Sequence, residues 1–453
     1  MTIAISRRRF VAFLASTAIA PIVQTTALAA PAGFQAIILS DLHSAYERMG
    51  QLLAAIENQV AAANLPQVIL INGDVFESGN VVGSRSAGEI DWALLAALAK
   101  LAPTVINIGN HESDFDNDLA HFVERAGGLG ITVLSNIGDK RTGKPFAPAS
   151  AEIDADGVKI RIAALGTDAI NTYAKATREM LDIPKPVEWA KAQLPGLLSG
   201  EDFKIVLSHA GVVPDRGILP ILPDGTLMIG GHDHLILEHG QGETRYVHTG
   251  SWSSLLTIAT FTSPRKAAEL ERVTIEHAAP SSATLTDLIP AVLAKHLKDE
   301  ERETVAHLAN PMTLGETARF AATAMAARTG ADLGFIGHTS FGTGLPSGDV
   351  SRFDYNAGLR FDGKLMVADV DAQTLAAIIA RSNQDGDVPL SARTGDFLYA
   401  APEIPKGKQQ YRIVCNDWSA INKKSYFGRD DLVFTEVPEL KLKPIVLEAL
   451  SKA

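Results

Sequence analysis

The chain contains a single cysteine, Cys415, among 453 residues. One cysteine excludes an intramolecular disulfide and any zinc site built on cysteine pairs, so Cys415 is expected to be a small buried residue. Basic residues are also scarce, since 41 lysines and arginines face 52 aspartates and glutamates, for a formal net charge of -11. This charge disfavours polymeric nucleic acid as a partner, because nucleic-acid binding needs basic patches. A small anionic ligand would need a local positive charge, which a metal site supplies.

Beyond the N-terminus, the sequence lacks an apolar run long enough to span a membrane. Residues 1–29 have the pattern of an export signal: three arginines at positions 7–9, an apolar stretch at 10–23, and a small-x-small cleavage pattern at 27–29. The paired arginines favour the twin-arginine export machinery, and an ordinary secretory signal is the alternative. We therefore expect a periplasmic or secreted protein without a stable membrane anchor.

The remaining sequence has the composition of a globular protein and is too long for one compact core. It is 46% apolar and 21% charged, and its length predicts two domains. Short apolar β-rich runs alternate with segments of helical periodicity, which is typical of layered α/β domains. Small residues and a proline at 278–283 indicate a linker, and residues 286–309 have the pattern of a helix. We expect domains at 34–276 and 303–453, joined by a linker and helix at 277–302.

Five apolar runs in the first domain each end in polar side chains that are able to bind a metal ion. The runs are residues 34–39, 68–71, 105–108, 203–207 and 227–229. The polar residues that follow them are Asp41 and His43, then Asp74, Asn110, His209, and finally His232 and His234. Ligands bind beyond the carboxyl ends of strands in α/β sheets, so these five ends are expected to converge on one site. Each motif alone is weak, but the ordered combination is specific.

The residue types in this set suit two divalent cations. Asp-x-His and His-x-His place two ligands on the same side of an extended segment. Imidazole together with carboxylate favours zinc, manganese, iron or cobalt over calcium or magnesium. Asp74 is the natural bridge between two ions, and Asn110 offers a neutral amide oxygen. Two dications with Asp41 and Asp74 leave a charge of about +2, which attracts a phosphate.

The ordered motifs resemble the signature of the calcineurin-like metallophosphoesterases: Asp41-x-His43, Gly73-Asp74, Gly109-Asn110-His111-Glu112, Ser208-His209 and Gly231-His232-x-His234. The resemblance covers residues 34–275 and implies a four-layer α-β-β-α sandwich, followed here by a smaller α/β domain. It implies one metal on Asp41, His43, Asp74 and His234, and another on Asp74, Asn110, His209 and His232. Such a pair would lower the pKa of a bridging water and provide hydroxide as the nucleophile.

A narrower resemblance, to the 5'-nucleotidase branch of this family, rests on chain length, the two-domain layout and three further motifs. These are Leu134-Ser135-Asn136, Gly166-Thr167-Asp168 and Thr249-Gly250-Ser251-Trp252. The resemblance implies that Asn136 contacts substrate and that His111 stabilises the transition state or protonates the leaving oxygen. Asp114 would orient His111, with Glu112 and Asp116 as competing partners. A solvated loop carboxylate is the alternative for Asp114.

The second domain departs from this branch at the segments that bind substrate. A substrate-binding arginine is replaced by Gly342, a Pro-Phe-x-Asn stretch reads Arg360-Phe361-Asp362-Gly363, and a glycine-rich stretch reads Lys423-Lys424-Ser425-Tyr426-Phe427. Aromatic residues remain, so a base could still stack there. We predict substrate contacts from Phe341, Arg360, Tyr426 and Phe427, with core packing as the alternative for Tyr426 and Phe427. Arg360, Lys423 or Lys424 could replace the missing positive charge.

The leading hypothesis is an exported binuclear hydrolase of a small phosphate ester, with a nucleotide as the expected substrate. A 2',3'-cyclic phosphodiesterase or a thiosulfohydrolase-like enzyme on the same scaffold is the alternative, because the specificity motifs are altered. A binding protein without turnover is the third hypothesis. The complete ligand set and His111 argue against that third hypothesis.

Overall fold

The computed structural model describes residues 33–405 and 407–452 of the chain, and these belong to one compact unit. The predicted export signal at residues 1–29 lies outside the described residues. Among the helices that the structure describes, none has the length and apolar character needed to cross a membrane.

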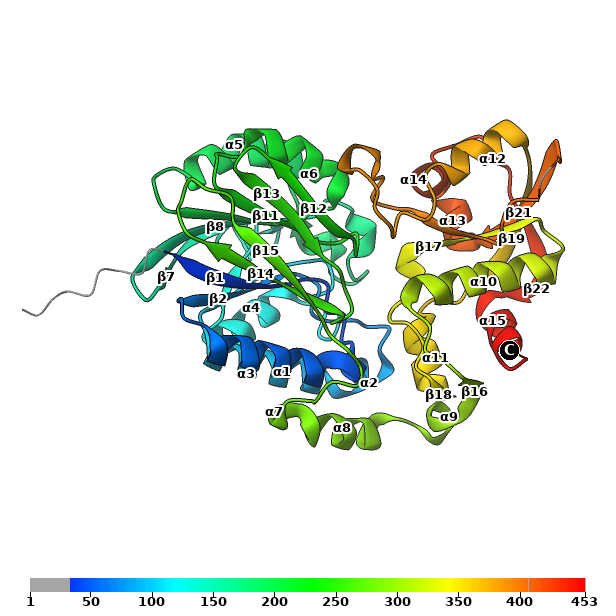
Figure 1. Cartoon of the computed structure of the whole chain (residues 1–453), viewed down its shortest axis with the longest axis horizontal. Helices are drawn as coiled ribbons and strands as arrows, with labels where there is room; N and C mark the ends of the chain where they lie inside the picture. The colour runs from blue at the N-terminus through cyan, green and yellow to red at the C-terminus, as the bar shows by residue number, and fades with distance from the viewer. Residues whose placement is uncertain (1–32, 406, 453) are drawn as a thin grey trace, which may run out of the picture. The chain divides into compact units, whose positions relative to one another are not determined.

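Two six-stranded sheets form the first domain (Figure 1). The first has the order β15(Glu269–Thr274), β14(Leu255–Phe261), β1(Phe34–Leu39), β2(Gln67–Asn72), β3(Thr104–Asn107), β4(Thr132–Leu134). The second has the order β12(Ile236–Gln241), β13(Thr244–Thr249), β11(Thr226–Gly230), β10(Phe203–His209), β8(Val158–Gly166), β7(Ser150–Ala155). The central strands β1, β2 and β3 are parallel, and so are β8, β10 and β11. Parallel strands align their carboxyl ends at one edge of each sheet.

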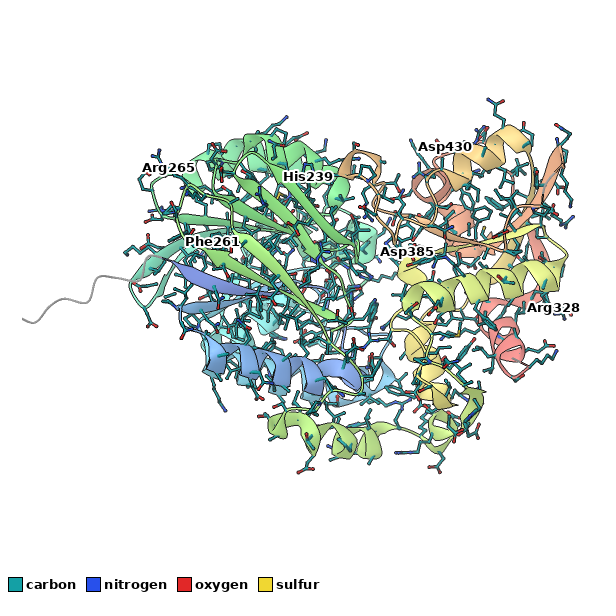
Figure 2. All side chains as sticks on the ribbon, viewed as in Figure 1. His239, Phe261, Arg265, Arg328, Asp385 and Asp430 are labelled. Carbon is teal, nitrogen blue, oxygen red and sulfur yellow. The ribbon has the colours of Figure 1, made fainter. Side chains whose placement is uncertain are left out.

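The two sheets pack face to face through alternate side chains of their strands. In β1, Ala36 and Ile38 point into the core between the sheets, whereas Ile37 and Leu39 point to the helices outside. Phe261, labelled in Figure 2, is fully buried and stacks on Phe34 with ring centroids 4.5 Å apart. The helices α1(Tyr46–Ala62), α3(Glu89–Leu101) and α4(Leu119–Gly128) cover the first sheet, and α5(Pro186–Leu197) and α6(Val212–Ile218) cover the second. The expected four-layer sandwich is confirmed.

The second domain is a smaller α/β unit built on one mixed sheet. The sheet has the order β20(Leu398–Ala401), β17(Leu333–Gly337), β21(Gln410–Asn416), β19(Lys364–Asp371), β22(Thr435–Lys441). One face packs against α10(Leu314–Thr329) and α15(Leu442–Leu450), and the other against α12(Ala372–Ile379), α13(Asp417–Ile421) and α14(Lys423–Phe427). Shorter elements are α2(Val81–Ser86), β5(Gly138–Asp139), β6(Lys144–Pro145), β9(Leu181–Asp182) and α11(Arg352–Gly358).

The segment between the domains packs against the first domain. It forms α7(Ala283–Thr286), α8(Leu288–His296) and α9(Asp299–Arg302), and Leu285 and Val292 join the core under the first sheet. The single helix expected over 286–309 is wrong, because the segment breaks into short helices and ends in β16(Thr304–Leu308), which pairs with β18(Gly348–Ser351). The β-branched pair Thr304-Val305 favours this strand.

Candidate active site

The carboxyl ends of five strands bring together all seven residues predicted as metal ligands. Asp41 and His43 follow β1, Asp74 follows β2, Asn110 follows β3, His209 ends β10, and His232 and His234 follow β11. His232 and His234 are partly exposed, and the other five are buried. The convergence arises because the aligned ends of β1–β3 face those of β10 and β11 across the sandwich.

The first group of ligand atoms comes from Asp41, His43, Asp74 and His234. His43 Nε2 lies 2.9 Å from His234 Nε2. It also lies 3.9 Å from Asp41 Oδ1 and 3.8 Å from Asp74 Oδ2. Atoms that share one metal ion at bond lengths of about 2.0–2.2 Å are themselves about 3–4 Å apart. The four residues therefore fit a single divalent ion.

The second group comes from Asp74, Asn110, His209 and His232. Asp74 Oδ2 lies 3.0 Å from His209 Nε2, and Asn110 Oδ1 lies 2.9 Å from His232 Nδ1. Ligand atoms of Asp74, His209 and His232 are all within 4.8 Å of one another. Asp74 thus faces both groups, as a carboxylate between two ions would.

Five of the seven residues have a left-handed backbone, which side chains other than glycine rarely adopt. Their φ angles are 51° for Asp41, 48° for His43, 54° for Asp74, 76° for His232 and 54° for His234. Each such residue costs of order 1–3 kcal/mol, and this kind of strain clusters at functional sites. Gly73, at φ 79°, lets the turn before Asp74 come close to Gly109, where a Cβ would lie 2.8 Å from the Gly109 backbone. The fold therefore holds these ligands in place at a cost in stability.

The electrostatics of the buried groups favour a cation between Asp74 and His209. His209 Nε2 has no hydrogen-bond partner among the described residues. Burial disfavours a charged ring, but the neighbouring Asp74 outweighs it and raises the pKa of His209 to about 10. A metal ion bound by His209 Nε2 would have to displace this proton and would supply the positive charge in its place. Burial lowers the pKa of His232 to about 4 and also lowers that of His234, which keeps both rings in their metal-binding form.

Asn72, the last residue of β2, ties the two sheets together beneath the site. Its side-chain amide donates to the carbonyl oxygens of Ser208 and Ile229 in the opposite sheet, at 2.9 and 3.0 Å. Its own carbonyl oxygen accepts from His209 Nδ1 at 2.7 Å, which leaves Nε2 of His209 for a metal. Sequence reasoning missed this residue, because a buried asparagine at a strand end is recognisable only from its partners.

His111 and Asp114 lie together at the edge of the ligand groups. His111 Nδ1 is 2.8 Å from Asp114 Oδ2, and the His111 backbone N–H donates to Asp74 Oδ1 at 2.9 Å. Glu112 instead accepts from the backbone N–H groups of Val75 and Gly109, and Asp116 is exposed, 3.7 Å from His121. Of the three carboxylates considered for His111, Asp114 is thus the one in contact with its ring.

The surroundings of His111 favour a proton on its ring. Burial opposes the charged form, but the charges of Asp114, Asp74 and Glu77 outweigh it and raise the pKa of His111 well above its usual value. Because Asp114 engages Nδ1, Nε2 is the nitrogen left for the adjoining cavity. His111 is therefore equipped to give a proton to a group bound there.

A cavity of about 1090 Å³ opens beside the ligand residues and is lined from both domains. Arg360 and Tyr426 line it, as two of the predicted substrate contacts. Asn136 is not among the lining residues; its Oδ1 accepts from the Gly166 backbone N–H at 2.9 Å and joins two strand ends. Lys423 does not line the cavity either, and its Nζ donates to the Leu432 carbonyl oxygen.

Phe341 and Phe427 are core residues, so their assignment to substrate binding is corrected. Phe341 is fully buried, and Phe427 packs against Phe335 with ring centroids 5.7 Å apart. The exposed rings in the cavity are Phe361 and Trp418, which are 50% and 49% exposed. Phe361 belongs to a segment that was compared with the 5'-nucleotidase branch, and Trp418 lies in α13, just before another such segment. Their exposure could not be read from residue type.

Comparisons with known proteins agree with this geometry. Residues 34–235 match the calcineurin-like phosphoesterase family. Among solved structures, a 5'-nucleotidase precursor from Thermus thermophilus is similar, with 17% identity, a TM-score of 0.60, and coverage of 93% of this chain and 96% of that one. The sulfate thiohydrolase SoxB of the same species gives 15% identity, a TM-score of 0.62, and coverage of 92% and 94%. No curated protein matches the sequence.

The first domain therefore belongs to the calcineurin-like metallophosphoesterases. The similarity to these solved structures covers both domains of the chain. At such low sequence identity it shows a shared fold and nothing about activity. The clustered histidines and aspartates are of the types, and at the separations, that could hold divalent metal ions.

Proposed function

We propose that the chain hydrolyses a phosphate monoester of a small molecule with two divalent metal ions, drawn from manganese, zinc, iron and cobalt. One ion would be held by Asp41, His43, Asp74 and His234, and the other by Asp74, Asn110, His209 and His232. The observation that carries this proposal is the backbone strain at five of the seven ligand residues, because a fold keeps such strain where a site requires it.

The chain's own residues orient the substrate and move the proton. When bound, the two metals would activate a water molecule and offset the charge of the phosphoryl oxygens. Asp114 holds the His111 ring through Nδ1, so Nε2 faces the cavity and can protonate the leaving oxygen. Lys175 and Arg178 also line the cavity and add positive charge near an anionic substrate.

A nucleotide is the substrate that the cavity supports best. Phe361 and Trp418 present half-exposed rings to it. The loop of Phe361 is adjacent to the start of α13, which carries Trp418, because a Cβ added to Gly363 would lie 2.5 Å from Asp417 Oδ1. Flat rings beside a phosphate site suit a base, which has a π-face of its own. A screen of the metal-reconstituted chain on nucleotides, cyclic nucleotides and sulfur esters tests this proposal. Turnover of only the cyclic or sulfur compounds would favour the alternative hydrolases.

Removing an exposed ring should weaken nucleotide binding selectively. One base stacked on a ring gains about 1–3 kcal/mol, so Phe361→Ala or Trp418→Ala should raise KM for AMP by roughly 5- to 150-fold. The same variants should leave p-nitrophenyl phosphate hydrolysis nearly unchanged, because that ester has no base. Steady-state kinetics on both substrates provides the measurement.

Phe427→Ala is the matched control for the ring variants. Loss of this core ring should lower the free energy of unfolding by about 3–5 kcal/mol, without changing the preference between the two substrates. An equal loss on AMP and on p-nitrophenyl phosphate in the Phe361 and Trp418 variants would mean that these rings are structural.

We infer export through the twin-arginine machinery from the arginines at positions 7–9. A precursor that folds before export can take up manganese or iron in the cytoplasm, ahead of tighter-binding zinc. The triple variant Arg7→Lys, Arg8→Lys, Arg9→Lys should therefore remain in the cytoplasm, as measured by cell fractionation. A normal periplasmic yield of this variant would rule out the twin-arginine route.

A further inference from the structure

Arg360 extends from the C-terminal domain to the metal-ligand residues of the first domain. It follows α11, and its backbone N–H donates to the Ser340 carbonyl oxygen. Its side chain is only 6% exposed, and Nη2 lies 3.0 Å from Glu77 Oε1. The guanidinium carbon also lies 4.4 Å from the centre of the Trp252 ring. The Arg360 guanidinium therefore contacts Glu77 and Trp252, although Arg360 also lines the cavity.

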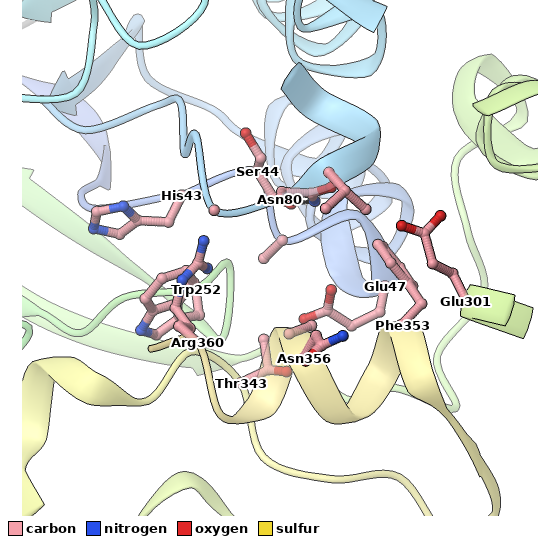
Figure 3. A pocket seen from close by; sticks show the side chains of 14 residues that line it. His43, Ser44, Glu47, Asn80, Trp252, Glu301, Thr343, Phe353, Asn356 and Arg360 are labelled. Carbon is pink, nitrogen blue, oxygen red and sulfur yellow. Dashed lines mark hydrogen bonds between the residues drawn. The ribbon is translucent and has the colours of Figure 1, made fainter. Parts of the chain in front are cut away.

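Glu77 connects Arg360 to the metal-ligand residue His43. Its Oε2 is the carboxylate oxygen that faces His43 Nδ1, at 3.4 Å, while Oε1 accepts from the Gly79 backbone N–H at 2.7 Å. Trp252 makes a second connection, because its ring stacks on His43 with centroids 4.4 Å apart and planes at 27°. Figure 3 shows Trp252 and Arg360 beside the His43 ring. Arg360 therefore contacts two side chains that neighbour His43, and Glu77 is the one that faces the His43 Nδ1 atom.

Two glycines, one from each domain, leave room for the Arg360 side chain. A Cβ on Gly79 would lie 2.7 Å from Arg360 Nη2. A Cβ on Gly342 would lie 2.2 Å from the Ala357 carbonyl oxygen and 3.2 Å from Arg360 Cδ. Gly342 is also where the nucleotidase branch is expected to carry an arginine. A side chain does not fit there in this chain, because its Cβ would collide with the Ala357 carbonyl oxygen and also crowd the Arg360 side chain.

We propose that Glu77 and Arg360 are positioning residues for His43. Nδ1 of His43 is buried and makes no hydrogen bond with a described residue, and the Glu77 carboxylate faces it at 3.4 Å. A proton on Nδ1 directed at Glu77 would leave the lone pair of Nε2 for a metal ion beside Asp41 and Asp74. A carboxylate on the far nitrogen of a metal-binding histidine sets both its tautomer and its orientation. This proposal depends on the proposed function in one respect, which is that His43 binds a metal ion.

Arg360 keeps Glu77 directed at His43. A carboxylate oxygen of Glu77 also lies within 4.8 Å of a ring nitrogen of His111 and a carboxylate oxygen of Asp114. Glu77 could therefore turn toward His111 and Asp114 instead of His43. The ion pair with Arg360 cancels the buried charge of Glu77 and holds it on the His43 side. A residue of the C-terminal domain thereby controls the affinity of one metal position in the first domain.

Competition with a fluorescent chelator for Zn²⁺ tests the proposal on the full mature chain. Arg360→Gln and Glu77→Gln should each weaken the position that contains His43 by about 10- to 100-fold, as loss of a partner of a metal-bound histidine does. The position that contains His209 should keep its affinity. The double variant should bind no more weakly than Glu77→Gln alone, because Arg360 acts through Glu77. Gly79→Ala leaves both charges but crowds the Arg360 guanidinium and Glu77 Oε1, so it should weaken the same position.

Arg216→Gln is the matched control, because Arg216 also crosses between the domains without touching the site. It donates to the carbonyl oxygens of Leu390, Ser391 and Arg393, at 3.2, 2.9 and 2.9 Å. This variant should keep both Zn²⁺ affinities. Equal weakening in Arg216→Gln, or unchanged affinity in Arg360→Gln, would overturn the proposal.

Nitrogen NMR of the ¹⁵N-histidine-labelled, metal-free chain gives a readout that does not depend on metal binding. His43 should carry its proton on Nδ1 in the wild type and should populate both tautomers in Glu77→Gln and Arg360→Gln. A wild-type His43 protonated on Nε2 alone would contradict the proposal. If the wild-type chain binds no Zn²⁺, the proposed function fails, and the NMR result still decides the positioning of His43.

Discussion

Asp74→Ala is expected to leave the chain without bound metal and without measurable hydrolysis. The carboxylate faces both ligand groups, since Oδ2 lies 3.8 Å from His43 Nε2 and 3.0 Å from His209 Nε2. Its loss removes a ligand from both positions and leaves His209 Nε2 buried without its charge partner. Metal ions supply several kcal/mol of transition-state stabilisation, so kcat/KM should fall by at least about 10³-fold. Elemental analysis and phosphate-release assays on the purified variant measure both effects.

Asp168→Ala is a suitable control for Asp74→Ala. Asp168 lines the same cavity but belongs to neither ligand group. This variant should retain its metal and most of its activity. Full metal content in Asp74→Ala would show that Asp74 does not bridge two ions and would remove the basis for a binuclear site.

His111→Ala should lower kcat by about 10²–10⁴-fold while the metal content stays unchanged, as expected for loss of a proton donor. The ligand groups are complete without His111, which instead contacts Asp114 and faces the cavity. The metal content of the variant, measured with kcat on the same preparation, separates a catalytic role from a ligand role.

Asp114→Asn should cost less than His111→Ala, because an amide oxygen can still accept from His111 Nδ1. A loss of metal in His111→Ala would instead make His111 a ligand. A larger effect of Asp114→Asn than of His111→Ala would mean that Asp114 does more than orient the ring.

The polar residues at the strand ends could be predicted, because each directly follows a recognisable apolar run in the sequence. The run before Asp41 and the run before Asp74 are recognisable strands, and parallel neighbours must align their carboxyl ends. The convergence of the five strand ends on one site was also expected from this rule, whereas the division of the residues into two metal-binding groups followed only from the family resemblance. The left-handed backbone at His43 or His234 could not be expected from residue type, because histidine has no preference that requires it.

The residues that could contact substrate were harder to predict, because their exposure depends on which face of a short helix or loop is buried. Tyr426 and Phe427 are neighbours in α14 and both are buried in the same core, yet only Tyr426 also lines the cavity. Phe341 is buried, whereas Phe361 is half exposed. The pairing of Arg360 with Glu77 joins residues far apart in the sequence, and neither has a motif that indicates the other.

Phosphate release from AMP by the mature chain, measured before chelation, after chelation and after return of Mn²⁺, tests the central claim most directly. The account predicts hydrolysis that disappears when metal is removed and returns with close to two Mn²⁺ per chain. Hydrolysis that persists in the fully metal-free protein, or a chain with two Mn²⁺ that cleaves neither AMP nor any other phosphate ester, would contradict it.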